Sequence, residues 1–360
     1  MSKKAEILKI WQECFPADGT EWKRMFFDAA YCDDDALTIS DPTDNVTVSS
    51  LLLLSYAMTF HGQKVGLAYV YGAGTLRKYR ARGFMSRLMA MAVSEAAERG
   101  DTFVCLIPAS DTLRQYYRRF GFATVGYSCP KRYTAAHRFP FSGSYVEANG
   151  DLLRLYPDFE RLTASRRCAV QQSRTQFLTV MDDARISNSP FAAVAEAESG
   201  RVVAMAWGRN EPASDVVRVT ELLADSDDAA NAVLSVMRKH CPDRPLTLMT
   251  HPDDDAEGGN FLPGAMFRVV NAGHALSIIA AAHPSLELTV RVSDPIVADN
   301  CGCYRIHSAS VEHLSALPVG CVPDLDITPE VLTALMFGSR PIAEVTGLPS
   351  IRPRISLMLD

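Results

Sequence analysis

The stretch Tyr79-Arg80-Ala81-Arg82-Gly83-Phe84-Met85 decides the fold of this chain of 360 residues. It follows the apolar run 67–71 and precedes residues 85–96, in which apolar side chains recur at helical spacing. A strand, a short basic loop with a glycine and then a helix form an arrangement that binds a pyrophosphate. The first N–H groups of a helix have no partner within it and lie at the positive end of its dipole. Arg80 and Arg82 add donors suited to phosphate oxygens, and Gly83 lets the backbone come close to the ligand.

A second element follows further along the chain. Residues 103–108 form a short apolar strand, and Ala109-Ser110-Asp111 is typical of the start of a helix. The helix that follows ends in Tyr116-Tyr117-Arg118-Arg119-Phe120-Gly121-Phe122. This order of strands and helices, with a strand hairpin before the loop, predicts a mixed α/β sheet.

Together, the loop and the second element resemble the GNAT N-acetyltransferases. That family has an acetyl-CoA loop of the form Arg/Gln-x-x-Gly-x-Gly/Ala, followed by a helix, a strand and a helix that ends in Tyr-x-x-Phe-Gly-Phe. Arg80 and Gly83 match the loop, whereas Met85 departs at its last position and narrows the space near the diphosphate. The resemblance implies acetyl-CoA as co-substrate, bound by the following residues: Ala73, Gly74, Thr75, Leu76, Arg80, Ala81, Arg82, Gly83, Phe84, Met85 and Ser110.

The order of segments along the whole chain resembles the Eis-like (enhanced intracellular survival) acetyltransferases. These join a GNAT domain, a second GNAT-like domain and a C-terminal domain of the sterol-carrier type. The resemblance implies an α/β (α+β) fold of tandem GNAT-like mixed sheets flanked by helices, plus a small sterol-carrier-like domain, and a trimer-based homo-oligomer. We expect the catalytic acetyl-CoA-binding domain at residues 1–135, a second GNAT-like domain without a pyrophosphate loop at 136–260, and the sterol-carrier-like domain at 261–360.

The middle of the chain repeats the strand order of its beginning. Runs 191–197, 202–207 and 216–223 read as strands, but the position of the basic loop is taken by Ala224-Asp225-Ser226-Asp227-Asp228. Three carboxylates at short range would repel a pyrophosphate by several kcal/mol, even when partly screened. The sequence therefore predicts that this second copy does not bind acetyl-CoA.

Composition limits the classes of function. The chain is 48% hydrophobic and 22% charged, which is typical of a soluble globular protein, and its length predicts two or three domains. A net charge of −6 disfavours nucleic acid as a partner, and no apolar run is long enough to predict a membrane span. The first residues lack a signal-peptide core, so we expect a cytoplasmic protein. Nine scattered cysteines and eight histidines show no metal-ligand spacing, so we expect reduced thiols and no metal.

The resemblance also implies catalytic roles. Tyr117 occupies the family's tyrosine position, where a phenol can protonate the departing thiolate; the alternative is that it packs against the cofactor arm. Tyr116 is expected to face the core. Eis-like enzymes use the terminal carboxylate of the chain as the base, which here would be that of Asp360; the alternative is a frayed C-terminus.

We therefore expect an acetyl-CoA-dependent N-acetyltransferase whose acceptor is the primary amine of a cationic small molecule or a lysine-like group. The acidic runs 33–35 and 253–255 would attract such an amine if they lay near the site, although runs of this kind are most often solvated loops. Two alternatives stay open. One is a non-catalytic acyl-CoA sensor or assembly protein, and the other is a lipid carrier that uses the C-terminal domain.

Overall fold

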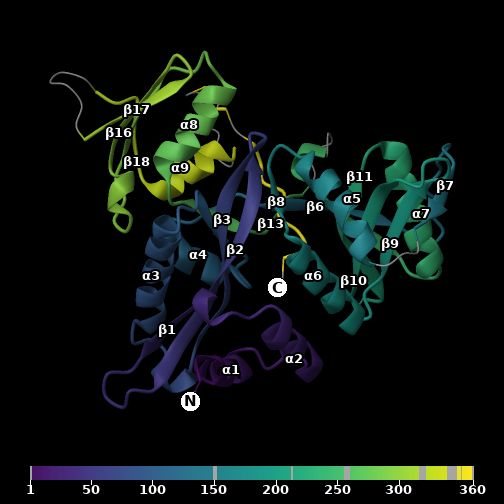
Figure 1. Cartoon of the computed structure of the whole chain (residues 1–360), viewed down its shortest axis with the longest axis horizontal. Helices are drawn as coiled ribbons and strands as arrows, with labels where there is room; N and C mark the ends of the chain where they lie inside the picture. The colour runs from purple at the N-terminus through teal and green to yellow at the C-terminus, as the bar shows by residue number, and fades with distance from the viewer. Residues whose placement is uncertain are drawn as a thin grey trace.

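The computed structural model describes residues 2–148, 152–211, 214–254, 260–315, 322–338, 347–349 and 351–358. These residues form two seven-stranded sheets and one four-stranded sheet, with helices against their faces (Figure 1). The mixed α/β fold expected from the sequence, with two successive mixed sheets, is confirmed. No helix in the described part of the chain is long and apolar enough to cross a membrane.

The first unit comprises residues 2–125 and contributes five strands to the first seven-stranded sheet. Its helices are α1 (Lys3–Cys14), α2 (Thr20–Ala29), α3 (Phe84–Glu98) and α4 (Asp111–Arg118), and its strands are β1 (Ala36–Ser40), β2 (Thr47–Phe60), β3 (Gln63–Thr75), β4 (Phe103–Leu106) and β5 (Ala123–Thr124). The strand order is β1-β2-β3-β4-β14-β5, where β14 is Met266–Val269, and β8 (Ala169–Gln171) pairs with β2. Strands β3 and β4 are parallel, and their paired register ends at Tyr69 and Cys105. The two strands therefore part at the end that leads to the basic loop.

The helix after the basic loop forms where its periodicity predicts. Gly83 is the N-cap of α3 and has a left-handed φ of 82°. One face of the helix is buried against the first sheet, through Leu88, Met89, Ala92, Val93 and Ala96. This apolar stripe fixes the rotation of the helix about its axis and so directs its N-terminus toward the parted strands.

The second unit comprises residues 127–250 and contributes six strands to the second seven-stranded sheet. Its helices are α5 (Leu152–Ala164), α6 (Arg174–Ile186) and α7 (Asp227–His240), and its strands are β6 (Tyr127–Tyr133), β7 (Tyr145–Glu147), β8 (Ala169–Gln171), β9 (Phe191–Glu196), β10 (Val202–Glu211), β11 (Val216–Ala224) and β12 (Leu246–Thr250). The order is β13-β6-β12-β11-β10-β9-β7, where β13 is Leu262–Pro263. Strand β8 alone among these joins the first sheet, by pairing with β2.

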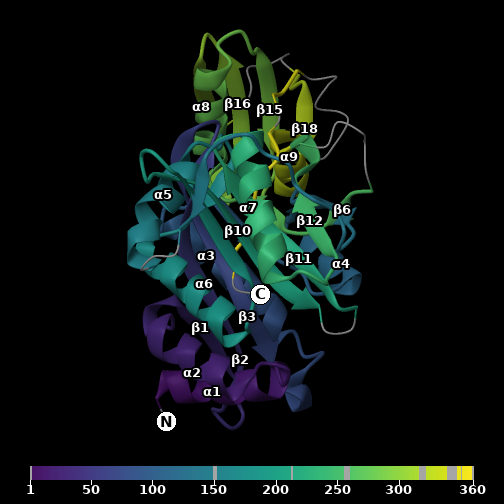
Figure 2. The same ribbon diagram turned by 90° about the vertical axis from the view of Figure 1, so that its right-hand side faces the viewer.

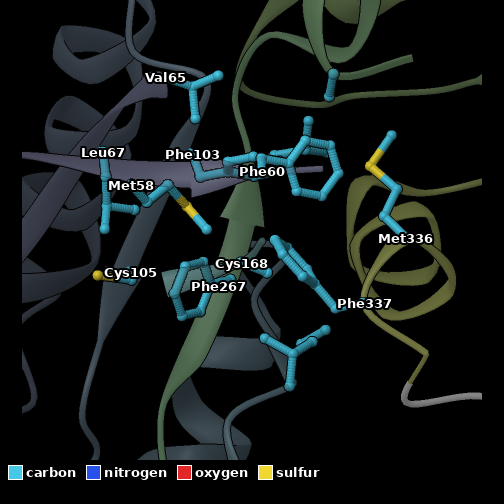
Figure 3. Close-up of a cluster of buried hydrophobic side chains, with 14 of the residues drawn as sticks. Met58, Phe60, Val65, Leu67, Phe103, Cys105, Cys168, Phe267, Met336 and Phe337 are labelled. Atoms are coloured by element: carbon cyan, nitrogen blue, oxygen red, sulfur yellow. The ribbon is translucent and has the colours of Figure 1, made fainter. Parts of the chain in front are cut away.

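The C-terminal unit comprises residues 270–338. It contains α8 (Ala272–Ala282), α9 (Pro329–Met336) and the strands β15 (Leu288–Val292), β16 (Gly302–His307), β17 (Ser310–Leu314) and β18 (Leu325–Ile327). In Figures 1 and 2 this unit lies above the first unit, with α8 and α9 between its sheet and the first sheet. Phe337 follows α9 and packs its ring 5.1–5.4 Å from the rings of Phe60, Phe103 and Phe267 of the first sheet (Figure 3).

The sheets cross the expected domain boundaries at residues 135 and 260. Strand β6 lies before residue 135 and belongs to the second sheet, where it pairs with β12. Strand β14 (Met266–Val269) lies after residue 260 and is inserted between β4 and β5 of the first sheet. The division of the chain into three domains remains a prediction, and the strand exchange ties the units together.

The tail, defined here as residues 351–358, runs between the first and second units. Arg354 forms a parallel bridge with Ala169 of β8, and its N–H donates to the Cys168 carbonyl at 3.0 Å. Gln172 donates to the Leu357 carbonyl at 2.7 Å. The yellow segment of Figure 1 follows this course.

Candidate active site

A cavity of about 460 Å³ lies where β3 and β4 part, between the end of β3, the basic loop and α4. We call it the loop cavity. Its lining is made by Cys14, Phe15, Ala73, Gly74, Thr75, Tyr79, Arg80, Ala81, Gly83, Phe84, Met85, Ser86, Leu113, Tyr116 and Tyr117. Nine of the residues expected from the sequence are therefore brought together around one space: Ala73, Gly74, Thr75, Arg80, Ala81, Gly83, Phe84, Met85 and Tyr117.

Three further residues expected at the site lie off this lining and have other partners. Leu76 is buried, and its N–H donates to the Val48 carbonyl at 2.9 Å. Ser110 is the N-cap of α4 and accepts from the Leu113 N–H at 3.3 Å. Arg82 is the third, and its surroundings differ from those of Arg80.

The two arginines of the loop face different neighbours. Arg80 is exposed at the edge of the loop cavity, and its Nε donates to the Thr75 carbonyl at 3.0 Å. Arg82 lies 2.7 Å from the buried carboxylate of Asp41 and above the rings of Tyr79 and Phe84. The pKa of Asp41 is lowered, first by a hydrogen bond from the Thr43 N–H and also by Arg82. Arg82 therefore shapes the loop, whereas Arg80 offers its charge to the cavity.

The N-terminus of α3 opens onto the loop cavity without a side-chain cap. Ala81 and Gly83 both have left-handed φ values, of 60° and 82°, so the chain turns sharply into the helix. Gly83 at the N-cap has no side-chain oxygen to accept from the first N–H groups of α3. These donors and the helix dipole favour an anion at this point.

Two tyrosines of α4 form the opposite wall. Tyr117 is 8% exposed, and burial raises the pKa of its phenol to about 12, with a further contribution from Tyr116. Its hydroxyl therefore stays protonated at neutral pH and is able to donate a proton or a hydrogen bond. Tyr116, expected to face the core, is the more exposed of the two, and its hydroxyl lies 3.2 Å from that of Ser86. Tyr116 thus packs partly against the core, as expected, but it also lines the loop cavity, and Tyr117 is the more deeply buried of the two.

Sequence reasoning missed the contribution of α1. Cys14 and Phe15, at the end of this helix, line the loop cavity. The Cys14 thiol lies 3.4 Å from the Thr75 carbonyl, and a Cβ added at Gly74 would lie 3.0 Å from its sulfur. Some 60 residues separate these partners in the chain, and no motif marks Cys14, so only the folded arrangement reveals the contact.

Comparison with known families identifies this part of the chain. Residues 2–125 match the family model described as acetyltransferase (GNAT) domain. The first unit is a GNAT acetyltransferase domain. Comparison with curated proteins finds no match to this chain.

Several solved structures share the fold over nearly the whole length. Eis1 from Mycobacterium abscessus is 15% identical with a TM-score of 0.76, and the likeness covers 100% of this chain and 99% of that one. A GCN5-related N-acetyltransferase from Anabaena variabilis is 16% identical with a TM-score of 0.75, over 97% and 92%. A GCN5-related N-acetyltransferase from Kribbella flavida is 18% identical with a TM-score of 0.72, over 96% and 88%. At these identities the likeness shows a common fold that includes the units after the GNAT domain.

A second cavity, of about 410 Å³, lies between the GNAT domain, the second unit and the tail. We call it the tail cavity. Ile107 lines it and directly follows β4, so the cavity reaches the strand end at which β3 and β4 part. Its wall carries charged side chains of both signs: Arg166, Arg209, Arg218, Arg354, Asp183, Glu221 and Asp254, together with His251.

Glu221 and Asp254 of the tail cavity both take part in ion pairs. Glu221 accepts from Arg166 at 3.0 and 3.2 Å and from the Ser356 hydroxyl of the tail. Asp254 accepts both arms of Arg354, at 2.6 and 2.7 Å. The Ser356 hydroxyl thus ties the tail to the second unit, and Arg354 ties it to the segment that follows this unit. Asp360, expected as the base, lies outside the described residues, as does Asp255 of the acidic run 253–255. The other acidic run, Asp33–Asp35, forms a short 3-10 turn before β1.

In the second unit, the start of α7 corresponds to the start of α3 in the first, but here side chains of the protein itself occupy the position. Asp228 accepts from the N–H groups of Ser142 and Gly143, both at 2.8 Å, and from the Tyr145 hydroxyl at 3.1 Å. Asp225 pairs with Arg161 at 2.8 Å, and Ser226 caps α7. The carboxylates that replace the basic loop thus have internal partners, and the N-terminus of α7 carries its own cap instead of an open donor group.

Proposed function

We propose that this protein is an acetyl-CoA-dependent N-acetyltransferase that acetylates a primary amine of a cationic small molecule or a lysine-like acceptor. One observation carries the proposal: the uncapped N-terminus of α3, Arg80 and Tyr117 face one cavity where β3 and β4 part. The arrangement offers donors for a diphosphate at one end and a proton donor at the other.

The residues of the loop cavity fit acetyl-CoA, which would supply the activated acetyl group as a thioester. The first N–H groups of α3 and the guanidinium of Arg80 would hold the diphosphate. The polar backbone at Ala73, Gly74 and Thr75 would orient the pantetheine arm. Gly83 leaves open space, since a Cβ added there would meet no atom within 4 Å.

Proton transfers complete the proposed chemistry. A primary ammonium has a pKa of about 10.4 and must lose a proton before it can attack. We assign this step to the terminal carboxylate of Asp360, and the course of the tail supports the assignment, because residues up to Met358 line the tail cavity beside the GNAT domain. Tyr117 would protonate the departing thiolate, whose conjugate thiol has a pKa of about 8.5. The tail cavity is then the place for the acceptor.

The finer family assignment is also part of the proposal. The full-length likeness to Eis1 from Mycobacterium abscessus supports an Eis-like protein with domains at 1–135, 136–260 and 261–360. A sterol-carrier-like role of the C-terminal domain in packing, a trimer-based homo-oligomer and a cytoplasmic location belong to the same proposal. Size-exclusion chromatography with light scattering tests the assembly.

An activity assay tests the function directly. Purified protein is incubated with acetyl-CoA and a panel of polyamines, aminoglycosides and lysine peptides while the free thiol is followed. We expect turnover with at least one amine, and a loss of about 10²-fold in kcat for Tyr117→Phe. Tight coenzyme A binding without turnover of any amine would favour the acyl-CoA sensor instead.

A further inference from the structure

The short helix α4 carries two of the three tyrosines that line the loop cavity, Tyr116 and Tyr117, and residues beyond 260 hold this helix in place. Arg114 of α4 donates to the Gly264 carbonyl at 2.8 Å and to the Pro263 carbonyl at 3.2 Å. Arg118, at the last turn, pairs with Glu330 of α9 at 3.0 Å. A helix of two turns is unstable by itself, so its position is set by such partners.

The third contact of α4 comes from a buried arginine of β14. Arg268 is fully buried, and its Nε donates to the Phe120 carbonyl just after α4 at 2.7 Å. Gly121, with a φ of 83°, makes room for it, since a Cβ there would lie 3.0 Å from Arg268 Nε. This explains the glycine of the Phe120-Gly121-Phe122 motif in this chain.

The other end of Arg268 is anchored in the C-terminal unit. Its Nη2 lies 2.6 Å from Asp294, and both side chains have 0% exposure. Asp294 also accepts from the side chain of Asn300 at 3.0 Å and from the N–H groups of Ile296 and Val297. The guanidinium of Arg268 thus connects the carboxylate of Asp294 in the C-terminal unit to the end of α4 in the first unit.

We propose that Arg268 is a positioning residue for Tyr117, supported by Glu330, so that the C-terminal unit aligns the proton donor of the GNAT domain. The inference rests on the proposed function, in which Tyr117 is the general acid. Arg268 does not line the loop cavity. It acts on the cavity through its hydrogen bond to the chain just after α4. A displacement of α4 of about 1 Å is enough to cost about 10²-fold in rate.

The test is a double-mutant cycle with Arg268→Lys and Tyr117→Phe in the full-length protein. Lysine keeps the charge for Asp294 but loses the fork that also reaches Phe120. We expect Arg268→Lys to lower kcat about tenfold with KM for acetyl-CoA within about twofold. Tyr117→Phe should then cost about tenfold on that background instead of about 100-fold. The inference would be overturned if Arg268→Lys left kcat unchanged. It would also be overturned if the double variant lost kcat by the product of the two single losses, because a purely structural role of Arg268 gives independent effects.

Amide hydrogen exchange gives a readout that does not need turnover. In Arg268→Lys the amides of α4 should exchange at least about tenfold faster, while those of α3 keep their rates. If the unaltered protein acetylates no amine, the proposed function fails by itself. The exchange rates of α4 then still decide whether Arg268 holds this helix in place: unchanged rates would overturn that role, and faster rates would support it.

A second variant covers the case in which Arg268→Lys does not fold. Glu330→Gln removes the partly exposed ion pair with Arg118. In a double-mutant cycle with Tyr117→Phe, we expect Glu330→Gln to lower kcat about threefold when Tyr117 is present and to have little effect when it is not. Arg305→Gln is the matched control, since it breaks an exposed pair with Glu312 at 3.2 Å within the C-terminal unit. A similar loss of kcat in this control would show a general effect of the unit and contradict the assignment.

Discussion

Arg80 and Arg82 stand two positions apart in the basic loop, and a sequence pattern treats them alike. In the structure, Arg80 lines the loop cavity, whereas Arg82 is engaged by the buried carboxylate of Asp41. The difference arises from the turn at Ala81, whose left-handed φ of 60° sends the two side chains to different sides. Of the two, Arg80 has the guanidinium that is available to a phosphate.

We expect Arg80→Gln to weaken coenzyme A binding about tenfold, because a hydrogen bond to a charged group contributes about 1.5–3 kcal/mol. Calorimetric titration with coenzyme A measures the change. Lys78→Gln is the control: it removes a positive charge from an exposed residue near the same loop that does not line the cavity. If Arg80→Gln and Lys78→Gln lose the same amount of affinity for coenzyme A, long-range attraction between positive charge and the ligand, and not a direct contact with Arg80, accounts for the effect.

Asp101 is a buried carboxylate at the far end of α3. Burial raises its pKa to about 6, although Arg99 acts in the opposite sense. The pKa of Asp101 is thus higher in the folded protein than in the unfolded chain. The protonated carboxyl of Asp101 therefore stabilises the fold fully below pH ~4, and this stabilisation is lost as the pH rises through about 6. We expect Asp101→Asn to raise the free energy of unfolding at pH 8 by about 1 kcal/mol, since water screens part of the charge.

Urea denaturation of both proteins at pH 5 and pH 8 checks this prediction for Asp101. The gain in Asp101→Asn should be smaller at pH 5, where part of the native carboxyl is already protonated. A gain that is the same at both values would assign the effect to packing instead of ionisation.

At the scale of elements, the long hairpin of β2 and β3 is shaped by a bulge under α1. The register shifts opposite Leu51, and Gly72 there has a φ of 60°. A Cβ at Gly72 would overlap the ring of Trp11, which is buried against this part of β3. The bulge thus brings α1, and with it Cys14, to the wall of the loop cavity.

Gly72→Ala should lower the free energy of unfolding by about 2–4 kcal/mol, because it adds both a steric clash and an unfavourable φ. Gly62→Ala separates the two causes. Gly62 has a φ of 83° but no atom within 4 Å of an added Cβ, so its cost should be about 1 kcal/mol. Thermal and denaturant unfolding measure both variants, and equal costs would contradict the steric argument.

The loop, α3, β4 and α4 could be predicted from the sequence because each is encoded by neighbours in the chain. Apolar spacing fixes α3, and Ser110 fixes the start of α4. Strand β14 could not be placed in the first sheet, since Met266 pairs with Leu106 across about 160 residues. Pairing of that kind leaves no local pattern. The wall contributed by Cys14 and the separate roles of Arg80 and Arg82 were hidden for the same reason.

At the scale of the whole molecule, the C-terminal unit is joined to the GNAT domain by an aromatic cluster. Phe337 has 0% exposure and contacts Phe60, Phe103 and Phe267 (Figure 3). Phe337→Ala should lower the free energy of unfolding by about 3–5 kcal/mol through the cavity that it leaves. Val322→Ala is the control, because Val322 is 84% exposed and should change stability little. A loss below about 1 kcal/mol for Phe337→Ala would show that the units are held mainly by the polar contacts.

The tail joins the units through apolar packing, in which Met358 is buried, and also through polar contacts that are partly exposed. Arg354 holds Asp254 with both arms, but the pair is 23% and 52% exposed, so Arg354→Gln should cost less than about 1 kcal/mol of stability. The proposed base lies at the end of this tail. We therefore expect Arg354→Gln to lower kcat/KM for the amine about fivefold while KM for acetyl-CoA stays within about twofold.

The pH dependence of the Arg354→Gln defect distinguishes a role in proton removal from a role in amine binding. An amine with a pKa of about 10.4 loses its proton in solution as the pH approaches that value, and the base is then no longer needed. The defect should shrink between pH 7 and pH 10 if the tail places the base. Arg291→Gln, which breaks an exposed pair with Asp326 at 3.1 Å, serves as the control and should match the unaltered protein at every pH. A defect of constant size across this range would instead mean that the tail contributes to binding the acceptor, and the assignment of the terminal carboxylate would be wrong.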